Sequence, residues 1–194
     1  MYTDVETFMA IDPSLKGTGI CVVSLEDPIV IFERIKYGDA PKVWGDLVDR
    51  VESILTLLRY VSTQYAPDTV AMEHPLPVGQ YVGGLAPLGM AITREFIRTH
   101  SRVTCFHPMY LTHLMKKRGY KHGELVALAE HIIQKDNFIK SVKRFSADEA
   151  VAFLLAYRML VKHGHVSNLE HSLLRRFKEE KEIVIDKKDE DIRT

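Results

Sequence analysis

The sequence predicts a single α/β domain built on a mixed five-stranded sheet that is flanked by helices. The chain has 194 residues, 46% of them hydrophobic, which suits one domain with a sizeable core. Its first apolar runs are separated by short turns, which is typical of antiparallel hairpins, and its later runs alternate with helical patterns. We therefore expect a three-strand antiparallel meander followed by two parallel strands.

The meander comes first, as three short runs rich in Val, Ile and Phe. The expected strands are residues 7–12, 18–24 and 28–36, with the turn PSLKG between the first two. A long amphipathic helix follows at residues 42–65, where apolar residues recur at helical spacing and Pro41 stands near the start.

The second half of the chain alternates strands and helices. Its expected elements are a strand at 68–72, a helix at 86–99, a strand at 102–106, a helical stretch after His107-Pro108 that breaks at Gly119, and helices at 123–135 and 146–162. Beyond Gly164 the chain becomes densely charged, which is typical of a solvated helix that fades into a mobile tail. We therefore expect residues 1–165 to form the domain and residues 166–194 a charged, partly disordered extension.

The charge is balanced overall but unevenly distributed. The chain has 26 Lys and Arg against 26 Asp and Glu, which argues against a uniformly basic nucleic-acid binder. Residues 116–144, however, hold eight Lys or Arg and three acidic residues. This basic segment is either a solvated helical face or a phosphate-binding surface, and charge alone does not decide between them.

Several features favour a soluble, cytoplasmic protein. No apolar run approaches the roughly 20 residues of a membrane helix, and the N-terminus lacks a basic region followed by a long apolar segment. Cys21 and Cys105 both lie inside apolar strand-like runs, so we expect buried thiols without a disulfide or a metal.

Acidic residues stand where expected elements begin or end. Asp12 ends the first strand, Glu73 follows a later strand, and Asp148 and Glu149 open the last helix. Because adjacent strand ends meet at one edge of an α/β sheet, these carboxylates are expected to come together. Such a cluster suits Mg²⁺ or Mn²⁺, and two ions about 4 Å apart would support phosphodiester hydrolysis. For Asp148 and Glu149, capping of the helix is the competing interpretation.

Five segments together resemble the RuvC family of Holliday junction resolvases over residues 7–162. They are IDPSLKGTGICVVS, VAMEHP, LGMAITREFI, VTCFHPMYLTHLMKKRGYKHGELV and SADEAVAFLLAYR. The resemblance implies an RNase H-like fold and a homodimer that cuts four-way DNA junctions in DNA recombination and repair, using Mg²⁺ held by acids. Asp12 and Glu73 match the first two acidic positions. The compact chain and charged tail also fit a phage-borne enzyme, in the cytoplasm of a bacterial or phage-infected cell.

The third acidic element departs from the family pattern, which has an Asp or His, two residues and then an Asp. In one register Asp148 is the first acid and Val151 stands at the second. In the other, Glu149 is the later acid and Ser146 stands at the earlier one. Both acids stay candidates for catalysis and metal binding, with Asp148 preferred.

The resemblance also implies residues that contact DNA. Leu76 and Tyr81 are candidate wedges that open the crossover, or they pack their own loop. The basic segment of the family corresponds here to four candidate phosphate contacts: Lys116, Lys117, Arg118 and Lys121. His74 and His107 are interpreted as structural rather than catalytic.

Three other classes of protein fit parts of the pattern. Asp12 followed by a Gly-containing turn and a second strand also resembles the phosphate loop of actin-like ATPases and sugar kinases, but that fold needs two lobes and a second such loop. An RNase H-like nuclease for an RNA/DNA hybrid or another branched substrate, and a catalytically weak module that binds branched DNA, both stay open because of Val151.

Overall fold

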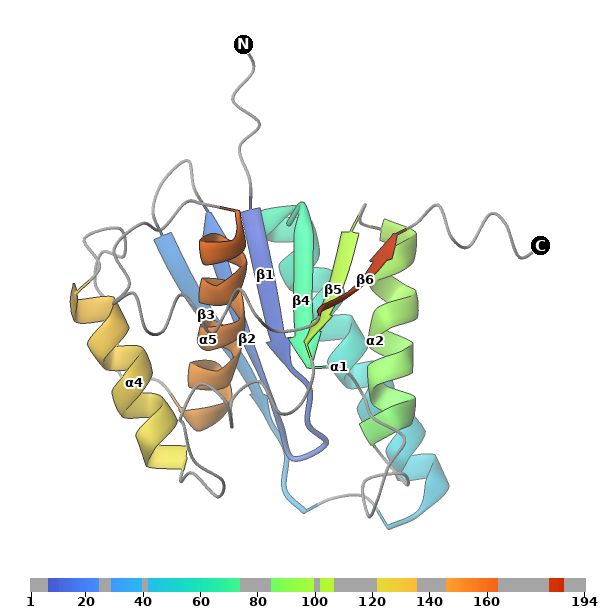
Figure 1. Ribbon diagram of the computed structural model, residues 1–194. Coiled ribbons are helices and arrows are strands. Elements are labelled where there is room, and N and C mark those ends of the chain that lie inside the picture. Colours follow the sequence, from blue (N-terminus) through green and yellow to red (C-terminus); the bar gives the residue numbers. More distant parts are fainter. Residues whose placement is uncertain are drawn as a thin grey trace.

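The structure, a computed structural model, describes residues 7–24, 29–39, 42–73, 85–99, 102–106, 122–135, 146–163 and 182–186. It is built on one mixed sheet with the strand order β3-β2-β1-β4-β5-β6 (Figure 1). The strands are β1 (Thr7–Asp12), β2 (Gly17–Ser24), β3 (Ile29–Lys36), β4 (Thr69–Glu73), β5 (Arg102–Phe106) and β6 (Glu182–Asp186). The first three strands pair antiparallel, while β4 and β5 run parallel to β1. The five predicted strands and their mixed pairing are thus confirmed, and β6 is a sixth strand in the same sheet.

The described helices also follow the sequence prediction, with ends that differ by at most two residues. They are α1 (Trp44–Tyr65), α2 (Leu85–Thr99), α4 (His122–Lys135) and α5 (Ala147–Lys162). In this part of the chain no helix is long and apolar enough to cross a membrane. The helical stretch expected after His107 lies outside the described residues.

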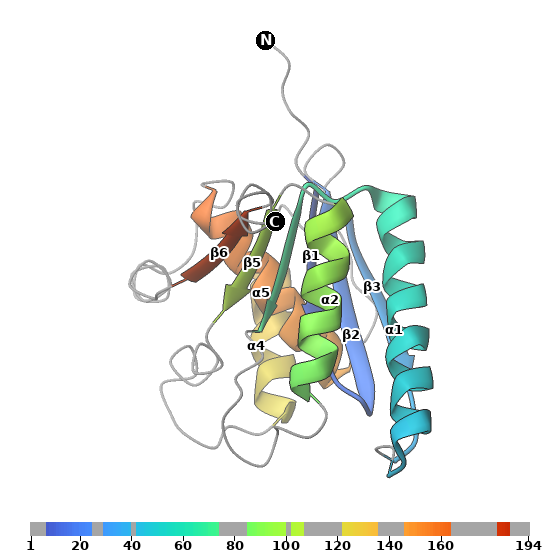
Figure 2. The same cartoon turned by 90° about the vertical axis from the view of Figure 1, so that its right-hand side faces the viewer.

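The helices cover the two faces of the sheet in pairs. Helices α1 and α2 pack on one face and α4 and α5 on the other, as Figures 1 and 2 show. Side chains alternate along a strand, so Met9 and Ile11 of β1 point toward α1 and α2. Phe8 and Ala10 point toward α5, and Asp12 shares their side of the strand.

Helix α5 is the central helix of its face. All residues from Ala150 to Val161 are buried, because the helix lies between the sheet and α4. The ring of His163, at its C-terminal end, lies 5.2 Å from that of Phe8 near the start of β1. Helix α5 therefore runs antiparallel to β1, and its N-terminus lies near the end of that strand.

The register of the two central strands is fixed at both ends. The backbone N–H of Thr7 donates to the Asp68 carboxylate at 2.7 Å, and that of Asp68 donates to the carbonyl of Thr7 at 2.8 Å. Further along, Ile11 of β1 pairs with Met72 of β4. Both strands therefore end at the same edge of the sheet, one residue beyond this pair.

Strand β6 is a difference from the sequence prediction, which placed a solvated helix and a mobile tail in this region. Its five residues, EIVID, pair antiparallel with β5. Without β6, the outer edge of β5 would expose a row of unpaired backbone groups. A short apolar segment forms hydrogen bonds with these groups, although charged residues flank it.

Cys21 and Cys105 are free and buried, as predicted.

Candidate active site

Two of the predicted acids lie side by side at the edge of the sheet. Asp12 is the last residue of β1 and Glu73 the last of β4, and both are partly exposed. Alternation places both side chains on the α5 face, while their chain neighbours Ile11 and Met72 are buried on the other face. On each strand, a buried core residue is therefore followed directly by an acidic residue.

Helix α5 brings a third acid to this edge. Asp148 lies in its first turn, next to β2, where Gly19 pairs with Asp12. A Cβ atom at Gly19 would lie 2.3 Å from the carbonyl carbon and oxygen of Asp148, a distance that no side chain tolerates. Glycine at this position is what allows α5 to begin beside Asp12. This role of Gly19 was not predicted from the sequence, although a glycine inside a strand is a signal of close approach.

The electrostatics indicate that the three carboxylates lie close together. Burial raises the pKa of Asp12 well above its usual range, and the negative charges of Glu73 and Asp148 raise it further. Burial alone raises the pKa of Glu73 to about 7. With all three groups ionised, the cluster is costly unless a cation offsets the charge.

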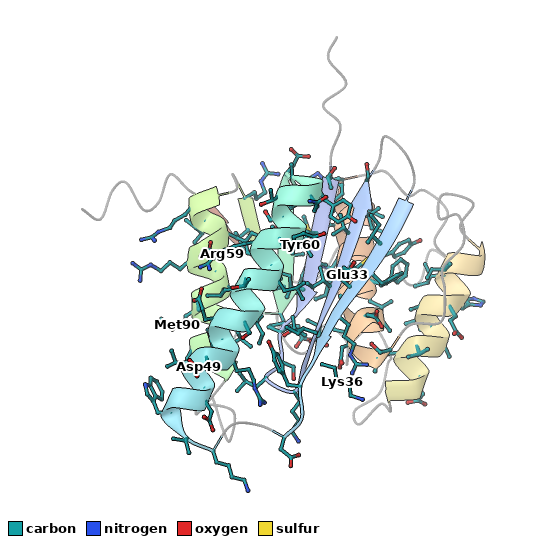
Figure 3. All side chains as sticks on the ribbon, turned by 180° about the vertical axis from the view of Figure 1, so that it is seen from behind. Glu33, Lys36, Asp49, Arg59, Tyr60 and Met90 are labelled. Atoms are coloured by element: carbon teal, nitrogen blue, oxygen red, sulfur yellow. The ribbon has the colours of Figure 1, made fainter. Side chains whose placement is uncertain are left out.

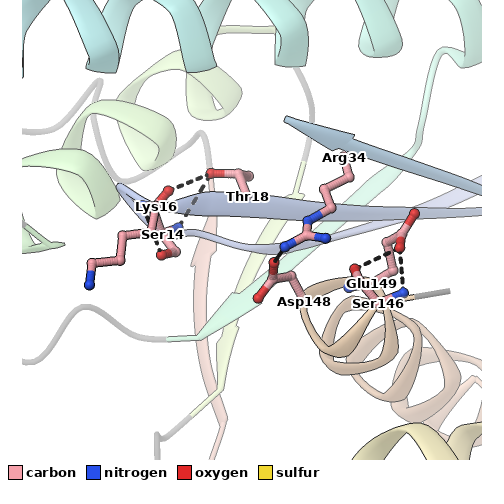
Figure 4. A network of polar contacts seen from close by, with 7 residues as sticks. All are labelled: Ser14, Lys16, Thr18, Arg34, Ser146, Asp148 and Glu149. Carbon is pink, nitrogen blue, oxygen red and sulfur yellow. Dashed lines mark hydrogen bonds and ion pairs between the residues drawn. The ribbon is translucent and has the colours of Figure 1, made fainter. Parts of the chain in front are cut away.

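The adjacent acids Asp148 and Glu149 make different contacts (Figure 4). Nη2 of Arg34 on β3 lies 2.6 Å from Oδ2 of Asp148. Glu149 instead closes a capping box, in which its Oε2 accepts from the backbone N–H and the hydroxyl of Ser146, each at 2.6 Å. Asp148 therefore faces the strand ends, whereas the carboxylate of Glu149 holds the start of the helix.

The turn after Asp12 is held by its own side chains and by α1. The hydroxyl of Thr18 donates to the carbonyl of Ser14 at 3.0 Å, as drawn in Figure 4. Nη1 of Arg50 donates to the carbonyls of Leu15 and Asp39, at 2.9 and 2.6 Å. These bonds fix the backbone immediately beyond the first acid.

The donor set fits a hard divalent cation in its chemistry. Carboxylate oxygens are the ligands that Mg²⁺ and Mn²⁺ prefer. The pKa of Asp12 is raised first by burial and then by the charges of Glu73 and Asp148, and a cation would offset both effects. Within the described residues, however, no group of three such side chains is already arranged around one point as metal ligands. One oxygen of Asp148 is bonded to Arg34 instead.

The predicted DNA contacts lie outside the described residues. These are Leu76, Tyr81, Lys116, Lys117, Arg118 and Lys121, and the same holds for His74 and His107. Arg34 and Gly19 were not predicted as site residues, and Gly17 was noted only as part of the turn after Asp12. A charged residue on a strand and two glycines in the run GTG were the signals that could have found them.

The sheet order, with helices on both faces, defines an RNase H-like fold. A structure of RuvC from Thermus thermophilus has a TM-score of 0.58 at 19% sequence identity, over 84% of this chain and 99% of the RuvC chain. T. thermophilus RuvC in complex with a Holliday junction substrate has a TM-score of 0.56 at 17% identity, with the same coverage. At these identities the similarity concerns the fold. No family model and no curated protein matches the chain.

Proposed function

We propose that this chain is a Mg²⁺-dependent, structure-selective endonuclease that resolves four-way DNA junctions by paired phosphodiester hydrolysis. One observation carries the proposal: carboxylates from β1, β4 and α5 converge at one edge of an RNase H-like sheet. A solved RuvC structure that holds a Holliday junction substrate has the same fold, which favours branched DNA as the substrate.

The proposed chemistry assigns roles to residues of three elements. Asp12, Glu73 and Asp148 would hold Mg²⁺, and two ions are expected from the sequence. The bound metal would activate a water and stabilise the leaving oxygen. Asp12 is the central ligand, since the charges of both other acids reach it. Glu149 stays a candidate ligand from the sequence, but its bonds to Ser146 favour a positioning role that fixes the first turn of α5.

The DNA contacts and the dimer extend the proposal. Lys116, Lys117, Arg118 and Lys121 would bind backbone phosphates, and Leu76 and Tyr81 would open the crossover; both roles rest on the resemblance to RuvC. Two copies related by a twofold axis would place two active sites on a twofold-symmetric junction and so explain paired cuts.

The structure changes where a dimer surface can lie. From the sequence, the apolar face of either the helix at 42–65 or the helix at 86–99 is a candidate dimer surface, but both faces pack on the sheet. Among the side chains that the structure describes on α1 and α2, the exposed large hydrophobic ones are Trp44, Val48, Tyr60 and Met90, of which Figure 3 labels Tyr60 and Met90.

A cleavage assay on matched substrates tests the function. Purified protein is incubated with a labelled four-way junction, a linear duplex of the same sequence and an RNA/DNA hybrid, in Mg²⁺ or in EDTA. We expect symmetric cuts in the junction alone, which disappear in EDTA and in Asp12→Asn. Junction binding without cutting would instead define a binding module, and cutting of the hybrid would define a ribonuclease.

A further inference from the structure

Arg34 on β3 reaches the acidic cluster across β2, which has glycine at positions 17 and 19. Asp12, Gly19 and Arg34 form one row across β1, β2 and β3, so about 10 Å of sheet separates Asp12 from Arg34. A Cβ atom at Gly17 would lie 3.0 Å from Oδ2 of Asp148 and 3.4 Å from Nη2 of Arg34. The ion pair therefore lies directly over Gly17, in space that any other residue would fill.

The guanidinium of Arg34 occupies an oxygen that the proposed metal site needs. Its Nη2 lies 2.6 Å from Oδ2 of Asp148, so the guanidinium competes with a divalent ion for this oxygen. Both cations are attracted by the same carboxylate, so binding of one weakens binding of the other.

The same guanidinium can also serve DNA. The side chain of Arg34 is 32% exposed and that of Asp148 is 23% exposed, so the pair lies at the surface of the site rather than inside the core. The planar fork of arginine binds the two oxygens of a phosphate in the way that it binds a carboxylate. A DNA phosphate bound at this edge of the sheet could therefore replace the Asp148 carboxylate as the partner of Arg34.

We propose that Arg34 is a phosphate-binding residue of the active site, held on Asp148 in the DNA-free protein and transferred to the DNA phosphate when a divalent ion takes Asp148. The inference rests on the proposed function, because it needs the acidic cluster to bind metal and DNA together. It implies that metal and DNA each strengthen the binding of the other through Arg34.

Metal binding without DNA tests the first half. Mn²⁺ is titrated calorimetrically into DNA-free wild type, Arg34→Gln and Arg59→Gln. We expect Arg34→Gln to bind Mn²⁺ about five-fold more tightly, since no guanidinium competes for Asp148. Arg59 is the matched control, because it too is paired with carboxylates, Glu52 and Glu95, but belongs to α1 on the opposite face. Thermal melting verifies that each variant is folded.

Junction binding with and without metal tests the second half. The affinity for a four-way junction is measured in Ca²⁺ and in EDTA at one salt concentration, with the junction verified intact on a denaturing gel. We expect the gain from Ca²⁺ to be about five-fold smaller in Arg34→Gln than in wild type or Arg59→Gln. Arg34→Lys keeps the charge but loses the fork, so its gain should be intermediate.

The outcomes separate this inference from the proposed function. A wild type that binds Mn²⁺ and cuts junctions, with an Arg34→Gln variant unchanged in both titrations, would overturn the role of Arg34 alone. Weaker Mn²⁺ binding by Arg34→Gln would overturn it too, because Arg34 would then position Asp148 for the metal. A wild type that neither binds Mn²⁺ nor cuts would overturn the proposed function and this inference with it.

Discussion

The two faces of the sheet differ in the residues that they carry at the ends of β1 and β4. On the α1 and α2 face the strands stay apolar to the edge, where Ile11 and Met72 are fully buried. On the α5 face the same strands change from core residues to Asp12 and Glu73. Because strand side chains alternate, one residue separates a packing position from a charged one. The same two strands can therefore carry stability on one side and chemistry on the other.

The largest expected effect is on the acidic edge. Asp12→Asn and Glu73→Gln should each lower the rate of junction cleavage by more than about 100-fold, because each removes a charge that would hold the metal. Junction binding in EDTA should stay largely intact, since neither acid is a phosphate contact. Single-turnover cleavage and a gel-shift assay measure the two properties. Substantial cutting by either variant would remove that residue from the site.

The neighbouring position on the other face should show the opposite behaviour. Met72→Ala removes a fully buried side chain next to Glu73 and should cost about 3 kcal/mol of unfolding free energy. Cleavage per folded molecule should change little, because Met72 points away from the acids. Urea denaturation gives the stability. A loss of cleavage without a loss of stability would break the separation between the two faces.

The contact between β2 and α5 is the next test. Gly19→Ala puts a methyl group into the backbone of Asp148, which forces α5 outward and should cost about 3 kcal/mol. Gly45→Ala on α1 is the matched control, since a Cβ atom there meets nothing within 4 Å. That variant should be neutral or slightly stabilising. Equal melting temperatures for the two variants would contradict the close approach at Gly19.

The sequence predicted the fold well because each element repeats a simple pattern. The helix from Trp44 to Tyr65 shows apolar spacing along its length, and the strand ending at Asp12 is an unbroken apolar run. The edge strand at 182–186 was missed because five residues within a charged segment give little periodicity. Residues 182–186 form a strand because they pair with β5, and β5 lies about 80 residues earlier in the chain.

The site was predictable only where it depends on strand ends. Asp12 and Glu73 could be placed because an acid after a buried run stands out. The choice between Asp148 and Glu149 could not be made from sequence, since both lie in the first turn of a helix. It depends on which carboxylate reaches Ser146. Arg34 pairs with Asp148 only because Gly17 has no side chain to fill the space of this ion pair.

The stability of the metal-free protein should depend on pH through Glu73, the acid that ends β4 on the α5 face. The pKa of Glu73 is about 7 in the folded protein and 4.5 ordinarily, so the folded state binds the proton more tightly. Stability should therefore fall as pH rises from about 4.5 to 7, by on the order of 3 kcal/mol. Glu73→Gln cannot lose this proton and should show a flatter profile. Denaturation in EDTA between pH 5 and 8 measures the difference, and parallel profiles would contradict the burial of Glu73.

The smallest expected effect concerns the start of α5. Ser146→Ala removes the hydroxyl that accepts from the N–H of Glu149 and donates to its carboxylate, and should cost about 1 kcal/mol. Glu149→Gln should lose part of the same stability and keep its cleavage, whereas Asp148→Asn should lose cleavage at little cost in stability. Denaturation and cleavage of the same samples separate these roles. Loss of cleavage in Glu149→Gln, with Asp148→Asn active, would transfer the third ligand to Glu149 and favour the register that places Ser146 at the earlier family position.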